Sequence, residues 1–172
     1  MKCIVKRIFI MLLSISIVLS VPLDVVLMNA NAASSLLYPL PEGSFVLTCP
    51  YSSGHKAVDW ATYGSKTGVP IYAVDDGVVR SAEVCGTYGV LIVLWHESIG
   101  RYTAYAHCEN TNYVTVGQTV KRGDVIATVG LTGNTTGPHL HFMIFKQMQS
   151  SISPYPAEST CENPLSYSYT YE

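Results

Sequence analysis

The sequence predicts an all-β domain, and two observations carry that prediction. Short runs of β-branched and other apolar residues recur along the chain, separated at short intervals by glycine, asparagine or aspartate turns. Such alternation is typical of strands joined by tight turns. No stretch places its apolar residues at the 3.6-residue period of an amphipathic helix. We therefore expect strands over residues 45–48, 69–74, 78–83, 89–95, 101–107, 125–129 and 139–145.

Three features of the sequence refine this prediction. The turn Asp75-Asp76-Gly77 separates residues 69–74 from 78–83, so its chemistry predicts a β-hairpin. Residues 89–95 are continuously apolar or β-branched, which predicts a central strand that is buried. The segment 147–172 is rich in serine, proline and tyrosine, and we expect an irregular tail that Cys161 pins to the domain.

The first 32 residues have the pattern of an export signal. Basic residues precede an apolar run over residues 8–21, and residues 30–32 form a small-x-small cleavage site. Pro22 and Asp24 interrupt the apolar stretch, which argues against a stable membrane span after cleavage. We therefore expect a secreted protein with a signal peptide (1–32), a lead-in segment (33–48), one domain (49–146) and the tail (147–172).

The charge of the remaining chain argues against nucleic acid as a partner. Cleavage would remove Lys2, Lys6, Arg7 and Asp24, leaving 7 basic and 11 acidic residues and a formal net charge of −4. A protein that binds nucleic acid needs a basic face to neutralise phosphates.

Four cysteines remain after residue 32, namely Cys49, Cys85, Cys108 and Cys161. An even number in an exported domain favours two disulfides, although the sequence leaves all three pairings open. Free buried thiols are the alternative. A cysteine-based zinc site is disfavoured because the chain has no Cys-x-x-Cys pair.

His139 and His141 are the residues that point most directly to chemistry. Side chains alternate along a strand, so both imidazoles face one side, while Leu140 points the other way into a core. Paired imidazoles can form half of a metal site, and the remaining candidates upstream are His55, Asp59 and His107. On their own, the two histidines could equally be a surface pair on an edge strand.

A catalytic zinc typically takes three protein ligands and leaves one position for water or substrate. His55, Asp59 and His141 offer two imidazoles and a carboxylate. His107 and His139 are then available to move protons and to stabilise a tetrahedral intermediate. In a straight strand the Cα atoms of residues 55 and 59 would lie about 13 Å apart, too far to share one ion. The chain must therefore bulge or fold back between them.

These residues occur in an order that resembles a known family. His-x-x-x-Asp at 55–59, Tyr-Ala-His at 105–107 and Gly-Pro-His-Leu-His at 137–141 are similar to the M23 family of zinc metallopeptidases, the lysostaphin- and LytM-type endopeptidases. The resemblance extends from about residue 55 to residue 145 and includes intervening phrases such as Val116-Gly117-Gln118-Thr119-Val120. That phrase is also similar to biotinyl or lipoyl carriers, but no lysine stands in a carrier motif at a hairpin tip.

The resemblance implies a compact antiparallel β-sheet domain with its site in a groove edged by loops. It implies that His55, Asp59 and His141 bind one Zn²⁺ and that His107 and His139 are catalytic. We assign His139 the role of general base and His107 the role of stabilising the oxyanion. The implied activity is hydrolysis of peptide bonds in peptidoglycan, in a cross-bridge or a stem peptide, by a monomer. The alternative is a non-catalytic member that binds the cell wall or activates an amidase.

One position departs from the family pattern. The family usually has glycine two residues after the first histidine, where this chain has Ala57. Glycine would ease a bend at that point. Alanine is tolerable there if φ is negative and costly if φ is positive.

Overall fold

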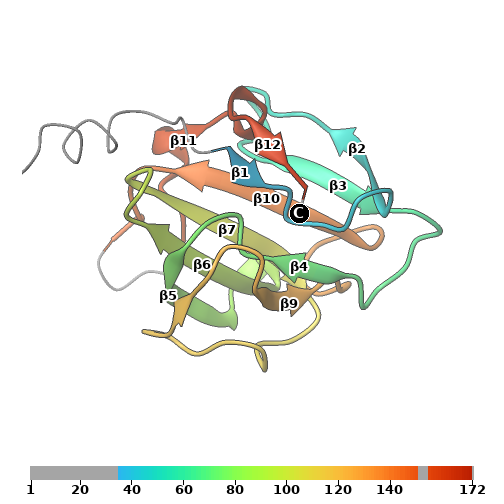
Figure 1. Ribbon diagram of the computed structural model, residues 1–172. Coiled ribbons are helices and arrows are strands. Elements are labelled where there is room, and N and C mark those ends of the chain that lie inside the picture. Colours follow the sequence, from blue (N-terminus) through green and yellow to red (C-terminus); the bar gives the residue numbers. More distant parts are fainter. Residues whose placement is uncertain (1–34, 151–154, 172) are drawn as a thin grey trace, which may run out of the picture. The chain divides into compact units, whose positions relative to one another are not determined.

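A computed structural model describes residues 35–150 and 155–171, so the predicted signal peptide lies outside the described residues. The described chain consists of β-strands, loops and three short 3-10 helices, which confirms the prediction of an all-β fold (Figure 1). The 3-10 helices are η1 (Gly86–Tyr88), η2 (Glu158–Thr160) and η3 (Pro164–Ser166). No helix within the two described ranges is long and apolar enough to cross a membrane.

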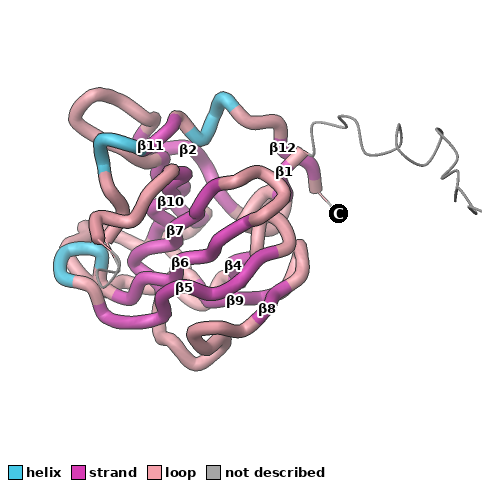
Figure 2. Tube along the Cα trace, turned by 90° about the vertical axis from the view of Figure 1, so that its left-hand side faces the viewer, coloured by secondary structure: helices cyan, strands magenta, loops and turns pink. Residues whose placement is uncertain are grey.

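An eight-stranded antiparallel sheet forms the body of the fold. Its strands follow the order β2-β3-β10-β7-β6-β5-β8, with β11 paired to β10. Figure 2 shows β10, β7, β6 and β5 lying beside one another in that order. Their bounds are β2 Phe45–Cys49, β3 Val58–Thr62, β5 Gly77–Val84, β6 Val90–His96, β7 Arg101–Cys108, β8 Thr119–Val120, β10 His139–Phe145 and β11 Cys161–Glu162.

Two small two-stranded sheets accompany the large one. Strand β4 (Pro70–Tyr72) pairs with β9 (Val125–Thr128) in antiparallel fashion. Strand β1 (Leu36–Leu37) pairs with β12 (Tyr169–Thr170) in parallel. The lead-in segment and the tail are thereby joined, although they stand at opposite ends of the described chain.

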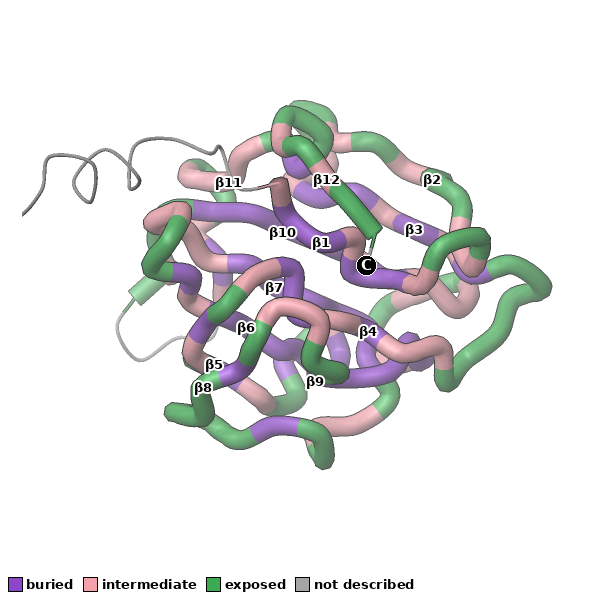
Figure 3. The backbone as a smooth tube through the Cα atoms, viewed as in Figure 1, coloured by how far each residue is buried: buried purple, intermediate pink, exposed green. Residues whose placement is uncertain are grey.

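Both faces of the large sheet are covered at its centre. Leu140, Phe142 and Ile144 of β10 belong to a core cluster that also contains side chains of the small sheets, such as Leu36 and Ile71. A second cluster on the opposite face holds the alternate residues of the same strands together with side chains of the tail. Strands β6, β7 and β10 are therefore buried along most of their length (Figure 3). Burial on both faces explains why residues 89–95 are apolar without alternation.

The predicted hairpin between residues 69–74 and 78–83 is wrong. Strand β4 pairs with β9, whereas β5 pairs with β6 and β8. The turn between them leads from one sheet into another, and the Asp76 carboxylate accepts hydrogen bonds from Lys121 Nζ (2.7 Å) and Arg122 N (2.9 Å). Turn chemistry predicted the change of direction correctly, but the choice of strand partner depended on residues far along the chain.

The tail is more regular than predicted, because β11 and β12 both pair with strands of the domain. Ion pairs reinforce this attachment: Arg101 Nε lies 2.8 Å from Glu162 Oε2. The Arg122 guanidinium donates to the Ser35 carbonyl (2.6 Å) and to Thr170 Oγ1 (2.7 Å), which ties the lead-in segment to the tail.

The prediction of two disulfides is also wrong, since Cys49, Cys85, Cys108 and Cys161 are free thiols in the structure. Cys108 is fully buried in the main core, where its thiol donates to the Tyr105 carbonyl (3.3 Å). Cys85 belongs to the second cluster, and Cys161 packs against that cluster from the tail. Strand pairing therefore attaches the tail without a covalent link.

His96 ends β6 as a fully buried, hydrogen-bonded imidazole. Its Nδ1 lies 2.9 Å from the Asp76 carbonyl oxygen and its Nε2 lies 2.8 Å from Thr103 Oγ1. Burial lowers the pKa of His96, and the nearby oxygens of Asp75 and Asp76 offset only part of that effect. The side chain is therefore a structural group at the junction of the turn with the sheet.

We predict that His96 makes the fold less stable in mild acid. Its folded-state pKa lies below the unfolded value of about 6.5, so the unfolded chain takes up a proton first and stability falls as the pH drops below that value. The measurement is urea unfolding at pH 7.5 and pH 5.5 for the native chain and for His96→Gln. The variant should lose less stability between the two pH values; an equal loss would contradict the assignment.

Candidate metal centre and active site

The register of β10 places the two histidines of the Gly-Pro-His-Leu-His motif. Strand β10 runs between β3 and β7, so His141 lies opposite Asp59 on one side and Ala106 on the other. His139 lies opposite Ala61 on β3. Leu140 is fully buried in the main core, so the two imidazoles emerge together on the other face of the sheet.

Asp59 and His55 reach the same point from β3 and from the loop before it. Strand β3 begins only at Val58, and the Ser52 amide donates to the His55 carbonyl (2.8 Å), so the chain turns here. That turn lies before His55; residues 55–57 are outside β3, and His55 Nε2 lies 3.2 Å from Asp59 Oδ2. Asp59 Oδ1 lies 2.8 Å from His141 Nδ1. Two imidazoles thus flank one carboxylate, and the chain between residues 55 and 59 is not a straight strand.

His107 enters the cluster through a backbone irregularity. Ala106 and His107 together lie opposite the single residue Leu91, which makes a bulge in β7, and His107 has a positive φ of 58°. A bulge re-aims a side chain, and such strained residues concentrate at functional sites. The ring of His107 lies 4.8 Å from that of His139 and 5.7 Å from that of His141, centroid to centroid.

A tightly packed loop fixes the orientation of His107. Its Nδ1 lies 2.8 Å from the Thr132 carbonyl oxygen, while the Thr132 hydroxyl donates to the Cys108 carbonyl (2.7 Å). Gly133 lets this loop press against the neighbouring one, because a Cβ there would come within 2.3 Å of the Gly89 nitrogen. Glycine is required at position 133 for two reasons: the close approach leaves no room for a Cβ, and the φ of 76° disfavours other residues.

His107 and His139 both present Nε2 to the cluster. His139 Nδ1 lies 2.9 Å from the Gly137 carbonyl oxygen, and His107 Nδ1 contacts the Thr132 carbonyl. A carbonyl can only accept a hydrogen bond, so Nδ1 carries the proton in each ring. The Nε2 atom of a neutral imidazole is then a proton acceptor, and that of His139 lies 3.8 Å from Asp59 Oδ1.

The electrostatics of the site suit a cation. Burial raises the pKa of Asp59, but the hydrogen bond from His141 and the adjacent imidazoles more than offset this, so the net effect lowers the pKa. Burial lowers the pKa of His107, against the opposing effect of the Thr132 carbonyl. Near neutral pH the cluster therefore contains an ionised carboxylate and a neutral His107.

These donors fit a catalytic transition-metal site. His55 Nε2, the Asp59 carboxylate and His141 Nδ1 converge with N···O separations of 3.2 and 2.8 Å. Two imidazoles and one carboxylate, with a further position open, form a donor set that zinc uses in hydrolases at bond lengths of about 2 Å. The side-chain donors of His107, His139 and His141 also lie within 4.8 Å of one another, so all five residues that the sequence singled out meet at one place.

The sequence did not indicate the contact that Cys49 makes with this centre. A register shift between β2 and β3 sets Cys49 opposite Asp59, and its Sγ lies 3.4 Å from His55 Nδ1. The Pro50 carbonyl oxygen lies at the same distance from that nitrogen. Groups behind a ligand imidazole set its orientation. No spacing rule links a cysteine six residues upstream to this position.

Ala57 fits without backbone strain. Among the described residues other than glycine, only Ser65 and His107 have positive φ, so Ala57 adopts an ordinary conformation. Its side chain is fully buried in the second cluster. The departure from the usual glycine therefore does not disturb the geometry of His55 and Asp59.

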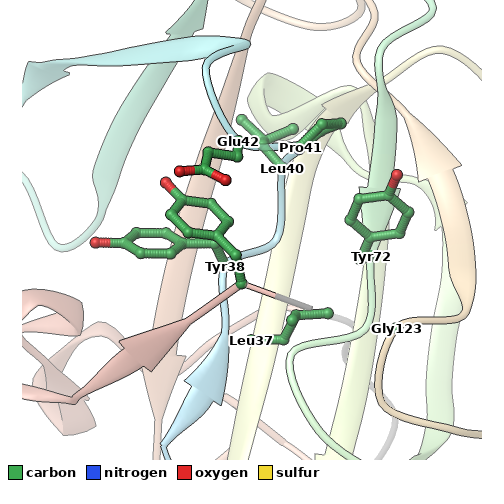
Figure 4. A pocket seen from close by; sticks show the side chains of 8 residues that line it. Leu37, Tyr38, Leu40, Pro41, Glu42, Tyr72 and Gly123 are labelled. Carbon is green, nitrogen blue, oxygen red and sulfur yellow. The ribbon is translucent and has the colours of Figure 1, made fainter.

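Two of the hollows on the described surface bear on the features already named; another, of about 550 Å³, is lined by Thr87, Tyr88 and tail residues that include Glu158. One of about 230 Å³ adjoins the metal centre and is lined by His55, His141, Lys56, Tyr88 and Glu158, among others. A second, of about 300 Å³, is lined instead by the lead-in segment, β4 and Tyr171, with Glu42 at its edge (Figure 4). None of the five site residues lines the second hollow, so the first is the groove that serves the site.

Comparison with known proteins decides the family. The sequence model of peptidase family M23 matches residues 53–154, which include all five site residues. The chain belongs to peptidase family M23. The peptidoglycan DD-endopeptidase ShyB of Vibrio cholerae is 42% identical over 93 residues, which is 52% of this chain and 20% of ShyB. The chain therefore spans only about a fifth of the length of this M23 relative.

Solved structures agree with the fold. The catalytic domain of lysostaphin from Staphylococcus simulans is 29% identical, with a TM-score of 0.57 over 70% of this chain and 87% of that domain. A zinc-containing peptidase from Vibrio cholerae is 32% identical, with a TM-score of 0.57 over 64% of this chain and 36% of that protein. The antiparallel sheet is thus the M23 fold.

We predict that Asp59→Asn weakens zinc binding by at least about 100-fold, since even groups that only orient a ligand contribute about 10- to 100-fold. Chelator competition measures the affinity, and the rise of the thermal midpoint on adding zinc provides a second readout. Glu42→Gln is the matched control, because it removes an exposed carboxylate from the other hollow. Unchanged affinity in Asp59→Asn would contradict the ligand assignment.

Proposed function

We propose that this chain is a secreted zinc metalloendopeptidase that hydrolyses peptide bonds in bacterial peptidoglycan, in a stem peptide or a cross-bridge. The observation that carries the proposal is the convergence of His55, Asp59 and His141 beside His107 and His139. Membership of family M23 and likeness to a DD-endopeptidase support the substrate class. The export pattern of residues 1–32 and the location of the cell wall support secretion.

His55 Nε2, the Asp59 carboxylate and His141 Nδ1 are the groups that would hold the zinc ion. When bound, zinc supplies a Lewis acid that polarises a carbonyl and makes a water molecule more acidic. The carboxylate contributes the negative charge of the ligand set, and its lowered pKa keeps it ionised for that purpose. The thiol of Cys49 and the Pro50 carbonyl hold the far side of the His55 ring.

His139 is the proposed general base. Its Nδ1 proton is committed to the Gly137 carbonyl, so Nε2 takes the proton of the attacking water. The resulting imidazolium lies beside Asp59, whose Oδ1 is 3.8 Å from Nε2. The same nitrogen can then give its proton to the amine that leaves.

His107 is proposed to stabilise the oxyanion, and its geometry sets a condition on that role. Because Nδ1 already donates to the Thr132 carbonyl, Nε2 can donate to an oxyanion only when the ring is an imidazolium. Burial lowers the pKa of His107, so the ring must gain its proton during turnover. The proton that His139 takes from the water passes to the leaving amine, so the proton on His107 comes from solvent.

The alternative function is that of a non-catalytic protein that binds the cell wall or activates an amidase. Such a protein has no need for a complete set of ligands and bases. The convergence of all five side chains at one end of the sheet favours the enzyme.

The test is mass spectrometry of fragments released from purified peptidoglycan by the zinc-loaded protein. Walls with direct stem cross-links and walls with glycine bridges are digested in parallel, and a chelator-treated sample is the control. We expect new peptide termini that depend on zinc. Intact walls in every digest, with one zinc per chain confirmed, would overturn the enzymatic proposal and favour the binding function.

A further inference from the structure

The groove beside the metal centre contains two charged residues of opposite sign that the proposed mechanism does not use. Glu158 begins η2 in the tail, beyond the matched residues 53–154, and lines the same hollow as His55 and His141. Lys56 follows His55 and lines that hollow too. Apart from His55 and His141, the other residues that line this hollow are uncharged: Ser53, Gly54, Thr87, Tyr88 and Met143.

Tyr88 lines the groove together with His141 and Glu158. The ring of Tyr88 lies 5.7 Å from that of His141, centroid to centroid. His55 lines the same hollow, so a phenol and a carboxylate stand beside two of the proposed ligands.

The backbone around Glu158 is anchored on both sides. Before Glu158, the Ala157 amide donates to the Gln147 carbonyl (2.9 Å), and after it Cys161 pairs with Phe145 of β10. The Nζ of Lys56 lies 5.3 Å from the centroid of the Tyr51 ring, a cation–π contact. A carboxylate and an ammonium group are thus held in one groove of about 230 Å³ next to the proposed zinc ligands.

We propose that Glu158 is a specificity-determining residue that binds a free ammonium group of the substrate, and that Lys56 binds a carboxylate. The preferred substrate is then a stem peptide whose diamino acid carries both groups, not an uncharged glycine bridge. This inference rests on the proposed function and names its substrate class. An uncharged chain in the groove would remove water from Glu158 without replacing the hydrogen bonds that the water made. Such a loss strongly favours a substrate with an ammonium group over one without it.

The test compares two synthetic peptides of the same sequence, one with a free ammonium group on the diamino acid and one with that group acetylated. Values of kcat/KM are measured for the native protein, Glu158→Gln and the control Glu42→Gln. On the free peptide, Glu158→Gln should lower kcat/KM by about 10- to 100-fold, which corresponds to the loss of one hydrogen bond to a charged group. On the acetylated peptide Glu158→Gln should be no slower than the native protein, and Glu42→Gln should match the native protein on both peptides.

A second variant guards against misfolding of the first. Glu158→Asp keeps the negative charge, so it should retain more of the selectivity for the free peptide than Glu158→Gln does. Equal losses on both peptides, or a native protein that does not distinguish them, would overturn the inference.

Equilibrium binding of both peptides separates this inference from the proposed activity. Absence of cleavage together with tighter binding of the free peptide, lost in Glu158→Gln, would overturn the activity and support the role of Glu158. Cleavage or binding without preference for the ammonium group would overturn that role and leave the activity intact.

Discussion

The site depends on the register of a single strand. Strand β10 is held between β3 and β7, with His141 opposite Asp59 and Ala106. A slip of one residue would exchange the two faces of the strand, sending both histidines into the core and Leu140 to the surface. Leu140, Phe142 and Ile144 are completely buried, and replacing one by alanine costs about 2–5 kcal/mol in comparable cores. The hydrophobic core therefore fixes the position of the proposed zinc ligands.

The two halves of the site are built in different ways. The proposed ligands come from paired strands and an adjoining turn, which provide a stiff frame for the metal. The proposed catalytic histidines depend on backbone carbonyls, of Gly137 for His139 and of Thr132 for His107. Those carbonyls select the tautomer and leave Nε2 of each ring facing the cluster. The positive φ of His107 is the local cost of aiming it there.

The sequence predicted what depends on local pattern. Alternation along residues 139–145 gave the correct strand and the shared face of His139 and His141. The spacing of His55 and Asp59 required a departure from a straight strand, and β3 indeed begins only at Val58, with the two side chains 3.2 Å apart. The all-β class followed from the turns and the absence of a helical period. The family order of the motifs predicted which five residues meet, which periodicity alone could not do.

What the sequence could not predict depends on distant partners. The Asp75-Asp76-Gly77 turn has hairpin chemistry, yet β4 finds its partner in β9, more than fifty residues along the chain. An even number of cysteines suggested disulfides, but all four thiols are free, even though Cys85 and Cys161 share the second cluster. Glu158 stands in a serine- and proline-rich tail with no periodicity, so only the pairing of β11 with β10 reveals that it reaches the groove.

The most direct test of this account is to measure zinc content and turnover side by side for His139→Ala and His141→Ala. The two residues lie on one strand face, two positions apart, but only His141 has the 2.8 Å contact with Asp59. We predict that His141→Ala loses both zinc and turnover. His139→Ala should keep one zinc per chain and lose about 10²- to 10⁴-fold in rate, the usual contribution of a general base. Full zinc content in His141→Ala, or near-native turnover in His139→Ala, would contradict the account.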